Sequence, residues 1–221
     1  MKNLIALAAL SLGTSVAAAP NLVVNGDFEA APAPAGAYSQ YGGGNGFTGW
    51  TATGNDILVI DKAYAEGSLV FNANDGSSNA VDLTGAGNTG PADGITQTVA
   101  TIGGKRYQLS FFVGNASPSG QNAGSYTQPS TLNLSIDGGA IMTFTNAVNV
   151  ANGIDFAQFT TFFTATGPTL LAFSNGTVGD NYLGLDNVSV SLVPEPATWG
   201  LMIAGFAMVG AVTRRRSALT A

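Results

Sequence analysis

The side chains that most enzymes use for acid–base or nucleophilic chemistry are missing from this sequence. It contains no histidine and no cysteine, which removes the commonest general base, the thiol nucleophile and most zinc sites. A serine or threonine nucleophile in the central part of the chain would have only Lys62 or Lys105 as a base. Glycosidic hydrolysis needs only two carboxylates, but the acidic residues occur singly, with no motif that pairs them. We therefore expect a protein that is not an enzyme, and a glycosidase remains the catalytic alternative.

Aromatic residues offer a different chemistry, the binding of sugars. Sugar recognition needs a flat aromatic face for C–H groups and a few planar hydrogen-bonding side chains. Trp50 either packs in the core at the domain edge or faces a sugar, and we favour the core. Tyrosines that lie mostly in loop-like segments are Tyr38, Tyr41, Tyr64, Tyr126 and Tyr182. The sequence singles out none of them as a binding platform, so the carbohydrate-binding residues stay unknown at this stage.

The charge balance limits the partners. The chain has 13 Asp and Glu against seven Lys and Arg, a formal net charge of −6. Between residues 20 and 193 the basic residues are Lys62, Lys105 and Arg106. Such an acidic surface argues against nucleic acid or anionic lipid as a partner and is compatible with divalent cations or neutral glycans. Without cysteine, stability must come from an apolar core or a metal.

The C-terminal segment combines three elements in a fixed order. A break formed by Pro194, Glu195 and Pro196 precedes an uncharged stretch over residues 197–213, and Arg214, Arg215 and Arg216 follow. As a helix this stretch would span roughly 25 Å, at the short end for a bilayer core of ~30 Å. The arginines would remain on the cytoplasmic side. The alternative is an apolar helix packed on a soluble core.

The order of these elements resembles the PEP-CTERM sorting signal of Gram-negative bacteria. The resemblance implies a sorting signal over residues 194–216, with a transmembrane helix at about 197–213 and a basic cluster at 214–216. It also implies that an exosortase of the inner membrane processes the chain at this signal. The membrane anchor would then be transient, and the protein would end at the cell surface or in the extracellular matrix.

The N-terminus agrees with export. A short basic start, Met1-Lys2-Asn3, precedes an apolar run from Leu4 to Val16 and three alanines. This pattern predicts a signal peptide over residues 1–19, read by the Sec machinery. Pro20 disfavours cleavage directly before it, so we favour a cut after Ala18. The alternative is a structural N-terminal helix. Residues 20–193 would be exported through the inner membrane.

The exported body shows the period of two that β-strands have. Thr131–Ile136 alternates strictly, and Asp137-Gly138-Gly139 is a hairpin-type turn that leads into residues 140–145. The same pattern predicts further strands at Asn21–Val24, Asp56–Ile60, Ala80–Leu83, Gly94–Val99, Tyr107–Val113, Phe156–Ala165, Thr169–Ser174 and Asp186–Leu192. Residues 31–46 and 114–130 look irregular and are expected to be surface loops. About ten short strands without a convincing helix predict an all-β antiparallel sandwich.

The order of several short motifs adds a second resemblance. The motifs are Asn21-Leu22-Val23-Val24-Asn25-Gly26-Asp27-Phe28-Glu29, Gly49-Trp50, Ala80-Val81-Asp82-Leu83, Gly94-Ile95-Thr96-Gln97-Thr98-Val99, Gly104-Lys105-Arg106-Tyr107 and Leu185-Asp186-Asn187-Val188. Together they resemble the galactose-binding-like jelly rolls, especially the domain of unknown function found in plant cell-wall proteins and many bacterial secreted proteins. The body is also similar to calcium-containing carbohydrate-binding modules. The resemblance implies an antiparallel jelly-roll β-sandwich, flanked by the signal helix and the transmembrane helix.

The same resemblance implies a structural calcium ion. In such jelly rolls the first and last strands lie close together, and Glu29 and Asp186 match the positions that supply carboxylates, with Asp27 as a further ligand. Calcium takes six to eight hard oxygens, so backbone carbonyls near Asn25 and Asp27 would complete the shell. The alternative is that these acids cap turns or accept hydrogen bonds from backbone amides.

These expectations combine into one hypothesis. The protein is exported, sorted by an exosortase and held in the envelope or matrix, where it binds extracellular polysaccharide without catalysis. A structural or adhesive matrix protein without specific sugar binding is the second hypothesis. A cluster of exposed aromatics with Asn, Gln or Asp in one concavity would favour the first, and a flat polar surface the second.

Overall fold

Antiparallel strands make up almost all of the regular structure in a computed structural model of the chain. The model describes residues 19–30, 33–86, 93–117, 126, 128–148, 153–176, 181–194, 200, 204–205 and 207. Sheet A contains, in spatial order, β1 (Tyr38–Gly42), β4 (Asp56–Asp61), β7 (Asn79–Asp82), β14 (Gly184–Leu192), β9 (Arg106–Ser117) and β12 (Gly153–Thr164). Sheet B contains β11 (Met142–Asn146), β10 (Ser130–Ile136), β13 (Thr169–Asn175), β8 (Gly94–Val99), β3 (Trp50–Thr53) and β2 (Gly46–Phe47).

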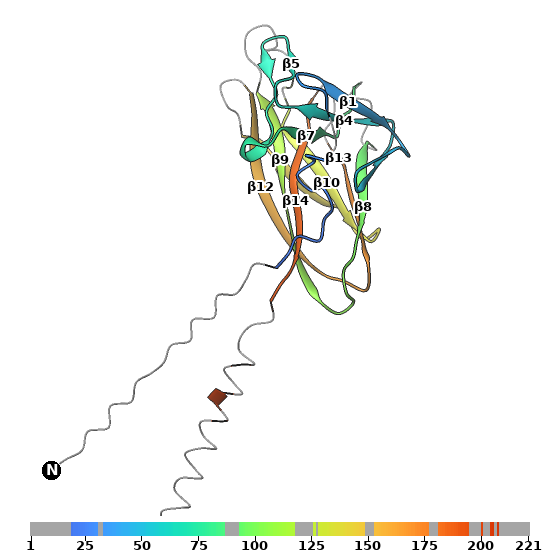
Figure 1. Ribbon diagram of the computed structural model, residues 1–221, viewed down its shortest axis with the longest axis vertical. Coiled ribbons are helices and arrows are strands. Elements are labelled where there is room, and N and C mark those ends of the chain that lie inside the picture. The colour runs from blue at the N-terminus through green and yellow to red at the C-terminus, as the bar shows by residue number, and fades with distance from the viewer. Residues whose placement is uncertain are drawn as a thin grey trace, which may run out of the picture.

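The two sheets face each other, as Figure 1 shows, and this arrangement confirms the predicted antiparallel jelly-roll β-sandwich. A two-stranded ribbon, β5 (Ala65–Glu66) and β6 (Leu69–Val70), and a 3₁₀ turn, η1 (Asn74–Gly76), lie outside the two main sheets. The strand with the strict alternation, β10, pairs with β11 across the predicted turn. The period of two therefore identified β8, β10, β11 and β13 of sheet B, whereas β2 and β3 were not predicted.

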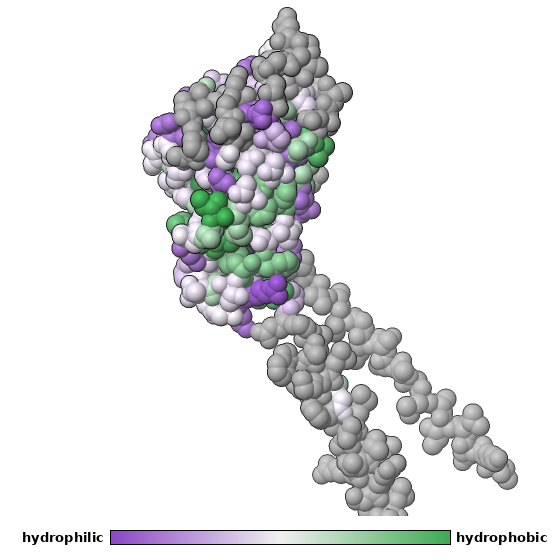
Figure 2. Space-filling view, turned by 180° about the vertical axis from the view of Figure 1, so that it is seen from behind, coloured by the Kyte–Doolittle hydropathy of each residue, from purple (hydrophilic) through white to green (hydrophobic). Residues whose placement is uncertain are grey.

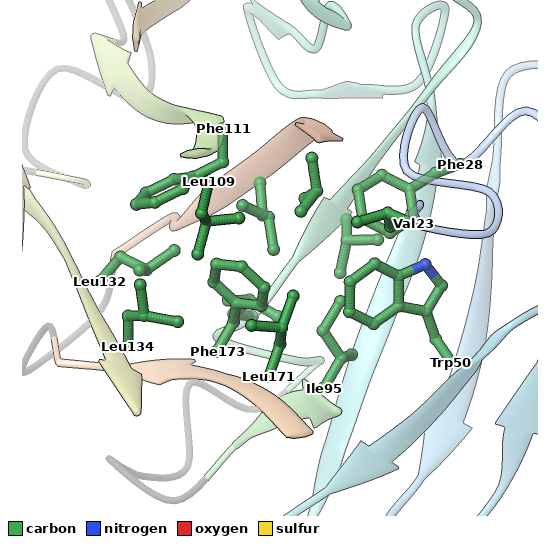
Figure 3. Packing of buried hydrophobic residues seen from close by; sticks show 14 of the residues in the cluster. Val23, Phe28, Trp50, Ile95, Leu109, Phe111, Leu132, Leu134, Leu171 and Phe173 are labelled. Atoms are coloured by element: carbon green, nitrogen blue, oxygen red, sulfur yellow. The ribbon is translucent and has the colours of Figure 1, made fainter. Parts of the chain in front are cut away.

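The main core fills the space between the sheets. Alternating residues of β9 point into it, so Tyr107, Leu109, Phe111 and Val113 are all buried, as their spacing predicts. Figure 3 shows Phe111 and Phe173 packed together, with Trp50 and Phe28 adjoining at one end of the core. Burial of this apolar area is the main favourable term in folding.

Three segments differ from the expectation. Residues 114–117, expected in a loop, belong to β9. Asn21–Val24 is not a strand, because the Asn21 side chain takes the place of a backbone ladder: its Oδ1 accepts hydrogen bonds from the Val190 and Val23 amides, each at 3.0 Å. Residues 31–46 are not wholly irregular, since Tyr38–Gly42 forms edge strand β1 against β4. The glycines that follow allow a close approach of backbones, because a Cβ on Gly43 would collide with the Gly54 carbonyl oxygen.

A second, smaller core covers the outer face of sheet A. On β4, Ile57 and Val59 face the main core, whereas Leu58 and Ile60 face this second cluster. Leu69, Phe71 and other residues of the segment after β4 pack over the same face. The Asn72 side chain fixes this cover to β12, because its amide donates to the Ile154 carbonyl and its Oδ1 accepts from the Ile154 amide.

The two ends of the sandwich domain lie side by side. The Leu22 amide donates a 2.8 Å hydrogen bond to the Val190 carbonyl, and Figure 1 shows the first described residues beside β14. The predicted signal helix falls almost entirely outside the described residues, as does most of the predicted transmembrane helix. In the part of the chain that the structure describes, no helix is long and apolar enough to cross a membrane.

Apolar residues also reach the surface. Figure 2 shows them gathered in a band across one side of the sandwich. The exposed large apolar side chains include Ile141, Phe162 and Leu170. Phe162 is covered in part by the Arg106 guanidinium, which lies 4.8 Å from the ring centroid.

Candidate functional site

A partly open cavity of about 120 Å³ lies on the outer face of sheet A, beneath the segment that carries the β5–β6 ribbon. We call it the tyrosine pocket. Leu58 and Ile60 of β4 belong to its apolar wall. Its aromatic residues are Tyr38, Tyr64, Phe71, Tyr126 and Tyr182, and its polar residues include Glu66, Asp82 and Asn181.

The aromatic rings form a continuous series. Tyr38 meets Tyr64 edge to face with centroids 5.3 Å apart, and Tyr64 lies 5.2 Å from Phe71. Phe71 in turn meets Tyr182 edge to face at 5.3 Å. These separations lie in the range where aromatic pairs attract beyond simple burial. Tyr38 is 39% exposed and Tyr182 only 2%, so the series leads from solvent into the domain.

Glycine creates the space for the inner end of this series. Gly184 lies in β14, directly beside Asp82 of β7. A Cβ on Gly184 would lie 2.6 Å from the Tyr182 hydroxyl, so the missing side chain lets the Tyr182 ring lie close to the sheet. Gly114 of β9, which pairs with Gly184, leaves similar room for the Phe156 ring.

Two carboxylates reach the pocket from different elements. Glu66, on β5, accepts a 2.8 Å hydrogen bond from the Tyr126 hydroxyl at its Oε2. Asp82, at the end of β7, is buried and accepts three hydrogen bonds at its Oδ1, from the Thr84 amide, the Thr84 hydroxyl and the Leu183 amide. Among the described residues, none donates to its Oδ2. Hydrogen bonds from described residues thus stabilise only one of the two carboxylate oxygens of Asp82.

Burial changes the acid–base behaviour of this region. Desolvation raises the pKa of Asp82 to about 7, although its hydrogen bonds to Thr84 and Leu183 act in the opposite direction, and Asp56 adds to the increase. Burial, with smaller contributions from Asp82 and Asp186, also raises the pKa of Tyr182 well above its usual value. The pKa of Tyr64 is raised by burial first and by Glu66 second. Each shift marks an environment that disfavours negative charge.

Two of the three acids predicted to bind calcium converge on residues 74–79, from the start of η1 to the first residue of β7. The Glu29 Oε1 accepts hydrogen bonds from the Ser78 and Asn79 amides, at 2.6 and 2.8 Å. The Asp186 Oδ2 accepts from the Asn74 amide at 2.9 Å and from the Ser77 hydroxyl at 3.2 Å. These acids, from the two ends of the body, therefore hold the same short segment.

Asp27 is hydrogen-bonded to the Glu29 backbone and lines a hollow of its own. Its Oδ1 accepts a hydrogen bond from the Glu29 amide at 3.4 Å. It lines a second hollow, of about 310 Å³, which neither Glu29 nor Asp186 lines. Asn25 and Asn187, both with left-handed backbone φ angles, border the same hollow.

The chemistry of the Glu29–Asp186 region is compatible with a hard cation. Asp186 is fully buried, and its pKa is raised to about 7 by desolvation, with a smaller contribution from Glu29. The side-chain Oδ1 of Asn79, whose backbone amide Glu29 binds, is buried without a hydrogen-bond partner. Over the described ranges no group of three or more acidic, His or Cys side chains is arranged to hold a metal. A calcium ion here would depend on two carboxylates, this amide oxygen and backbone oxygens or water.

Some aromatic residues lie where the sequence predicts and others do not. Trp50 is in the core, 2% exposed, and its indole N–H donates a 2.9 Å hydrogen bond to the Asn25 carbonyl. Tyr182, which the sequence places in a loop, is buried. Sequence reasoning did not single out Glu66, Phe71 or Asp82 as site residues. The available signal was β4, whose apolar residues on both faces indicate that something covers the outer face of its sheet.

Two family models match the chain. The model described as "Protein of unknown function (DUF642)" matches residues 21–190. The model of the PEP-CTERM protein-sorting motif matches residues 192–216. These matches confirm the resemblances read from both parts of the sequence. No curated protein matches the chain.

Several solved structures are similar to this chain to different degrees. A cyclase from Fischerella sp. TAU, solved in complex with 4-(1H-indol-3-yl)butan-2-one, has a TM-score of 0.56 at 17% identity, over 81% of this chain and 98% of its own. The CBM22-1 xylan-binding domain of Paenibacillus barcinonensis Xyn10C has a TM-score of 0.41 at 16% identity, over 74% of this chain and 99% of its own. A family 35 carbohydrate-binding module from Clostridium thermocellum has a TM-score of 0.39 at 14% identity, over 65% of this chain and 92% of its own.

Proposed function

We propose a function from the premise that this chain belongs to the DUF642 family and carries a PEP-CTERM protein-sorting motif. The protein is exported, processed by an exosortase, and retained at the cell surface or in the extracellular matrix. There it binds polysaccharide through the tyrosine pocket, without catalysis. The family description states no activity, so the binding proposal depends on the pocket.

The sorting motif supports the route that this function requires. The Sec machinery would move the body across the inner membrane, and the apolar segment 197–213 would hold the precursor there. Pro194, Glu195 and Pro196 would mark the processing region, with Arg214, Arg215 and Arg216 on the cytoplasmic side. Pro194 is exposed two residues after the end of β14, which is compatible with access by a processing enzyme.

The observation that carries the binding proposal is the series of rings from Tyr38 to Tyr182, with polar groups beside it. Sugar rings present C–H groups on their faces and hydroxyls at their edges, so they need aromatic surface and hydrogen-bonding groups together. Tyr38, Tyr64 and Tyr126 are partly exposed in one concavity, and Asp82 and Asn181 line it. The volume of about 120 Å³ suits one sugar ring better than a longer stretch of polysaccharide.

A bound calcium ion is part of the proposal. Glu29, Asp186 and the Asn79 Oδ1 would hold it, and it would join the N-terminal segment to η1 and β14. Its role would be structural, because it would neutralise a buried carboxylate that is otherwise costly. Asp27 would contribute only after a rearrangement, since it lines a different hollow.

A glycan array tests the binding proposal. The full-length chain, purified in a detergent without a sugar head group, is applied with and without calcium. Saturable binding to a defined set of glycans is expected. If no glycan binds under either condition, the protein is a structural or adhesive matrix component instead.

One observation keeps a glycosidase as the second candidate. Glu66 and Asp82 both line the pocket, and two carboxylates in a cleft are the minimum that glycosidases need. The proposal predicts that a glycan which binds is recovered intact after prolonged incubation. Release of new reducing ends, lost in both Glu66→Gln and Asp82→Asn, would establish hydrolysis.

A further inference from the structure

The tyrosine pocket combines aromatic rings with negative charge. Glu66 and Asp82 line it, and no lysine or arginine lines it within the described residues. Asp56 lies close enough to Asp82 to raise its pKa further. The electrostatic potential inside is therefore negative, which favours a ligand that carries positive charge.

The rings add to the same preference. The face of a tyrosine or phenylalanine ring carries negative charge density and attracts a cation within about 6 Å of the centroid. Tyr38, Tyr64, Phe71 and Tyr182 form one wall in mutual contact. An ammonium group that enters between this wall and a carboxylate would meet both kinds of attraction at once.

The two carboxylates are arranged differently. Glu66 is held by the Tyr126 hydroxyl at Oε2, which orients the carboxylate without neutralising it. Asp82 is buried, and its hydrogen bonds from described residues all end on Oδ1. The Asp82 Oδ2 is not one of the buried atoms that lack a partner, and Asp82 lines the pocket, so a cation or a donor in the pocket can compensate this oxygen. A ligand ammonium supplies both, because it has three N–H donors and a positive charge.

Other sugar classes fit less well. A uronic acid or a sulfated sugar would bring a negative charge to carboxylates that lack a basic neighbour in the pocket. A neutral sugar would find aromatic surface and acceptors, but would bring no positive charge to Glu66 or Asp82. An N-acetylated amino sugar has one amide N–H and no charge, so it would lose most of the electrostatic gain.

We propose that the tyrosine pocket recognises a sugar with a free amino group, so that the ligand is a polysaccharide containing de-N-acetylated hexosamine units. The ammonium group lies between the ring series and the carboxylates of Glu66 and Asp82. The sugar ring occupies the outer part of the pocket, beside Tyr38 and Tyr64. This inference rests on the proposed binding function and specifies its ligand class.

A matched pair of ligands tests it. Isothermal titration calorimetry compares an oligomer of β-1,4-linked glucosamine with the fully N-acetylated oligomer of the same length, using the full-length chain in a detergent without a sugar head group. We expect the free amine to bind at least about tenfold more tightly, a difference of about 1.4 kcal/mol. Glu66→Gln, which keeps shape and removes charge, should reduce affinity for the amine about tenfold and leave affinity for the acetylated oligomer nearly unchanged.

Control variants separate the pocket from the overall acidity of the protein. Asp137→Asn removes one negative charge from the β10–β11 turn, where Asn tolerates the left-handed backbone of this residue. It should leave both affinities unchanged. If it weakens amine binding as much as Glu66→Gln does, the attraction is nonspecific and the inference fails.

Three further outcomes would overturn the inference. Equal affinity for the two oligomers would remove the role of the amine while leaving glycan binding intact. If the protein binds array glycans that lack amino groups but binds neither oligomer, the amine also has no role. Equal affinity for a lysine-rich peptide would show that the pocket reads ammonium groups without a sugar. Failure of every glycan on the array would instead refute the proposed function itself.

Discussion

Tyr126 donates a 2.8 Å hydrogen bond to Oε2 of Glu66, a residue 60 positions earlier in the chain. Glu66 belongs to the short β5–β6 ribbon, which lies outside both main sheets. The bond joins this ribbon to the segment before β10 and closes one side of the tyrosine pocket. The segment that packs over the outer face of sheet A thus lines the pocket together with the sheet itself. This explains how a common sandwich fold acquires a specific site.

The raised pKa of Asp82 predicts a dependence of stability on pH. The folded-state pKa is about 7 and the reference value is 3.8, so the folded protein binds more protons than the unfolded chain between these values. The free energy of unfolding should therefore decrease as the pH rises from about 4 to about 7, by at most about 4 kcal/mol for this group. Urea unfolding at a series of pH values measures the change.

Asp82→Asn isolates this contribution. The Asn Oδ1 still accepts from the Thr84 and Leu183 amides but does not ionise, so the variant should lose the Asp82 share of the decrease and gain relative stability at pH 8. Asp137→Asn should keep the wild-type profile. A wild-type profile in Asp82→Asn would show that Asp82 does not titrate in this range.

Calcium should raise the thermal stability of the protein. An ion that binds only the folded state adds about 2.7 kcal/mol at a concentration of 100 times its Kd. For a domain of this size that corresponds to an increase in Tm of roughly 5–10 °C. Differential scanning calorimetry with EDTA and with excess calcium should show this difference for the wild type.

Glu29→Gln should reduce that difference, because it replaces an exposed ligand carboxylate by a neutral group of the same shape. Asp27→Asn should leave most of it, since Asp27 lies in the other hollow. No response of the wild type to calcium would mean that Glu29 and Asp186 act only as acceptors for backbone amides.

Gly184→Ala should damage the pocket from beneath. The added methyl group would lie 2.6 Å from the Tyr182 hydroxyl, so the ring must move outward into the pocket. We expect glycan affinity to fall about tenfold or more, and stability to fall by about 1–3 kcal/mol from overpacking. Gly167→Ala is the matched control, because a Cβ at Gly167 meets nothing within 4 Å. Equal affinities for the two variants would show that Tyr182 does not shape the ligand site.

The sorting motif predicts where the precursor accumulates. Deletion of residues 197–221 should release the body into the periplasm or the medium, because the apolar segment that holds the precursor is removed. Replacement of Arg214, Arg215 and Arg216 by glutamine tests the basic cluster separately and should impair retention while keeping the apolar segment. Cell fractionation with immunoblotting measures both effects. Unchanged fractionation of the deletion variant would contradict the role of this segment.

The sequence predicts the strands and turns whose conformation depends on neighbouring residues. The strict alternation of Thr131–Ile136 and its Asp-Gly-Gly turn predict β10 and its hairpin, because strand period and turn conformation are set by neighbouring residues. Tyr107 follows the same logic and is buried. Trp50, expected in the core from the family resemblance, is buried as well.

Long-range packing decides the remainder. Tyr38–Gly42 pairs with β4 although its glycine-rich surroundings suggest a loop. Tyr182 becomes buried because Phe71 covers it from more than a hundred positions away. The tyrosine pocket arises from such distant contacts, so the sequence could supply its tyrosines but not their arrangement.

Binding by pocket variants tests the central claim, glycan recognition in the tyrosine pocket, most directly. Calorimetry would compare a glycan that binds the wild type with Tyr64→Ala and with Phe162→Ala, which removes an exposed aromatic ring outside the pocket. We predict that Tyr64→Ala weakens binding by about tenfold or more, in line with the loss of about 1.4 kcal/mol or more, and that Phe162→Ala binds like the wild type. Wild-type affinity in Tyr64→Ala together with loss of binding in Phe162→Ala would place the ligand elsewhere and contradict the account.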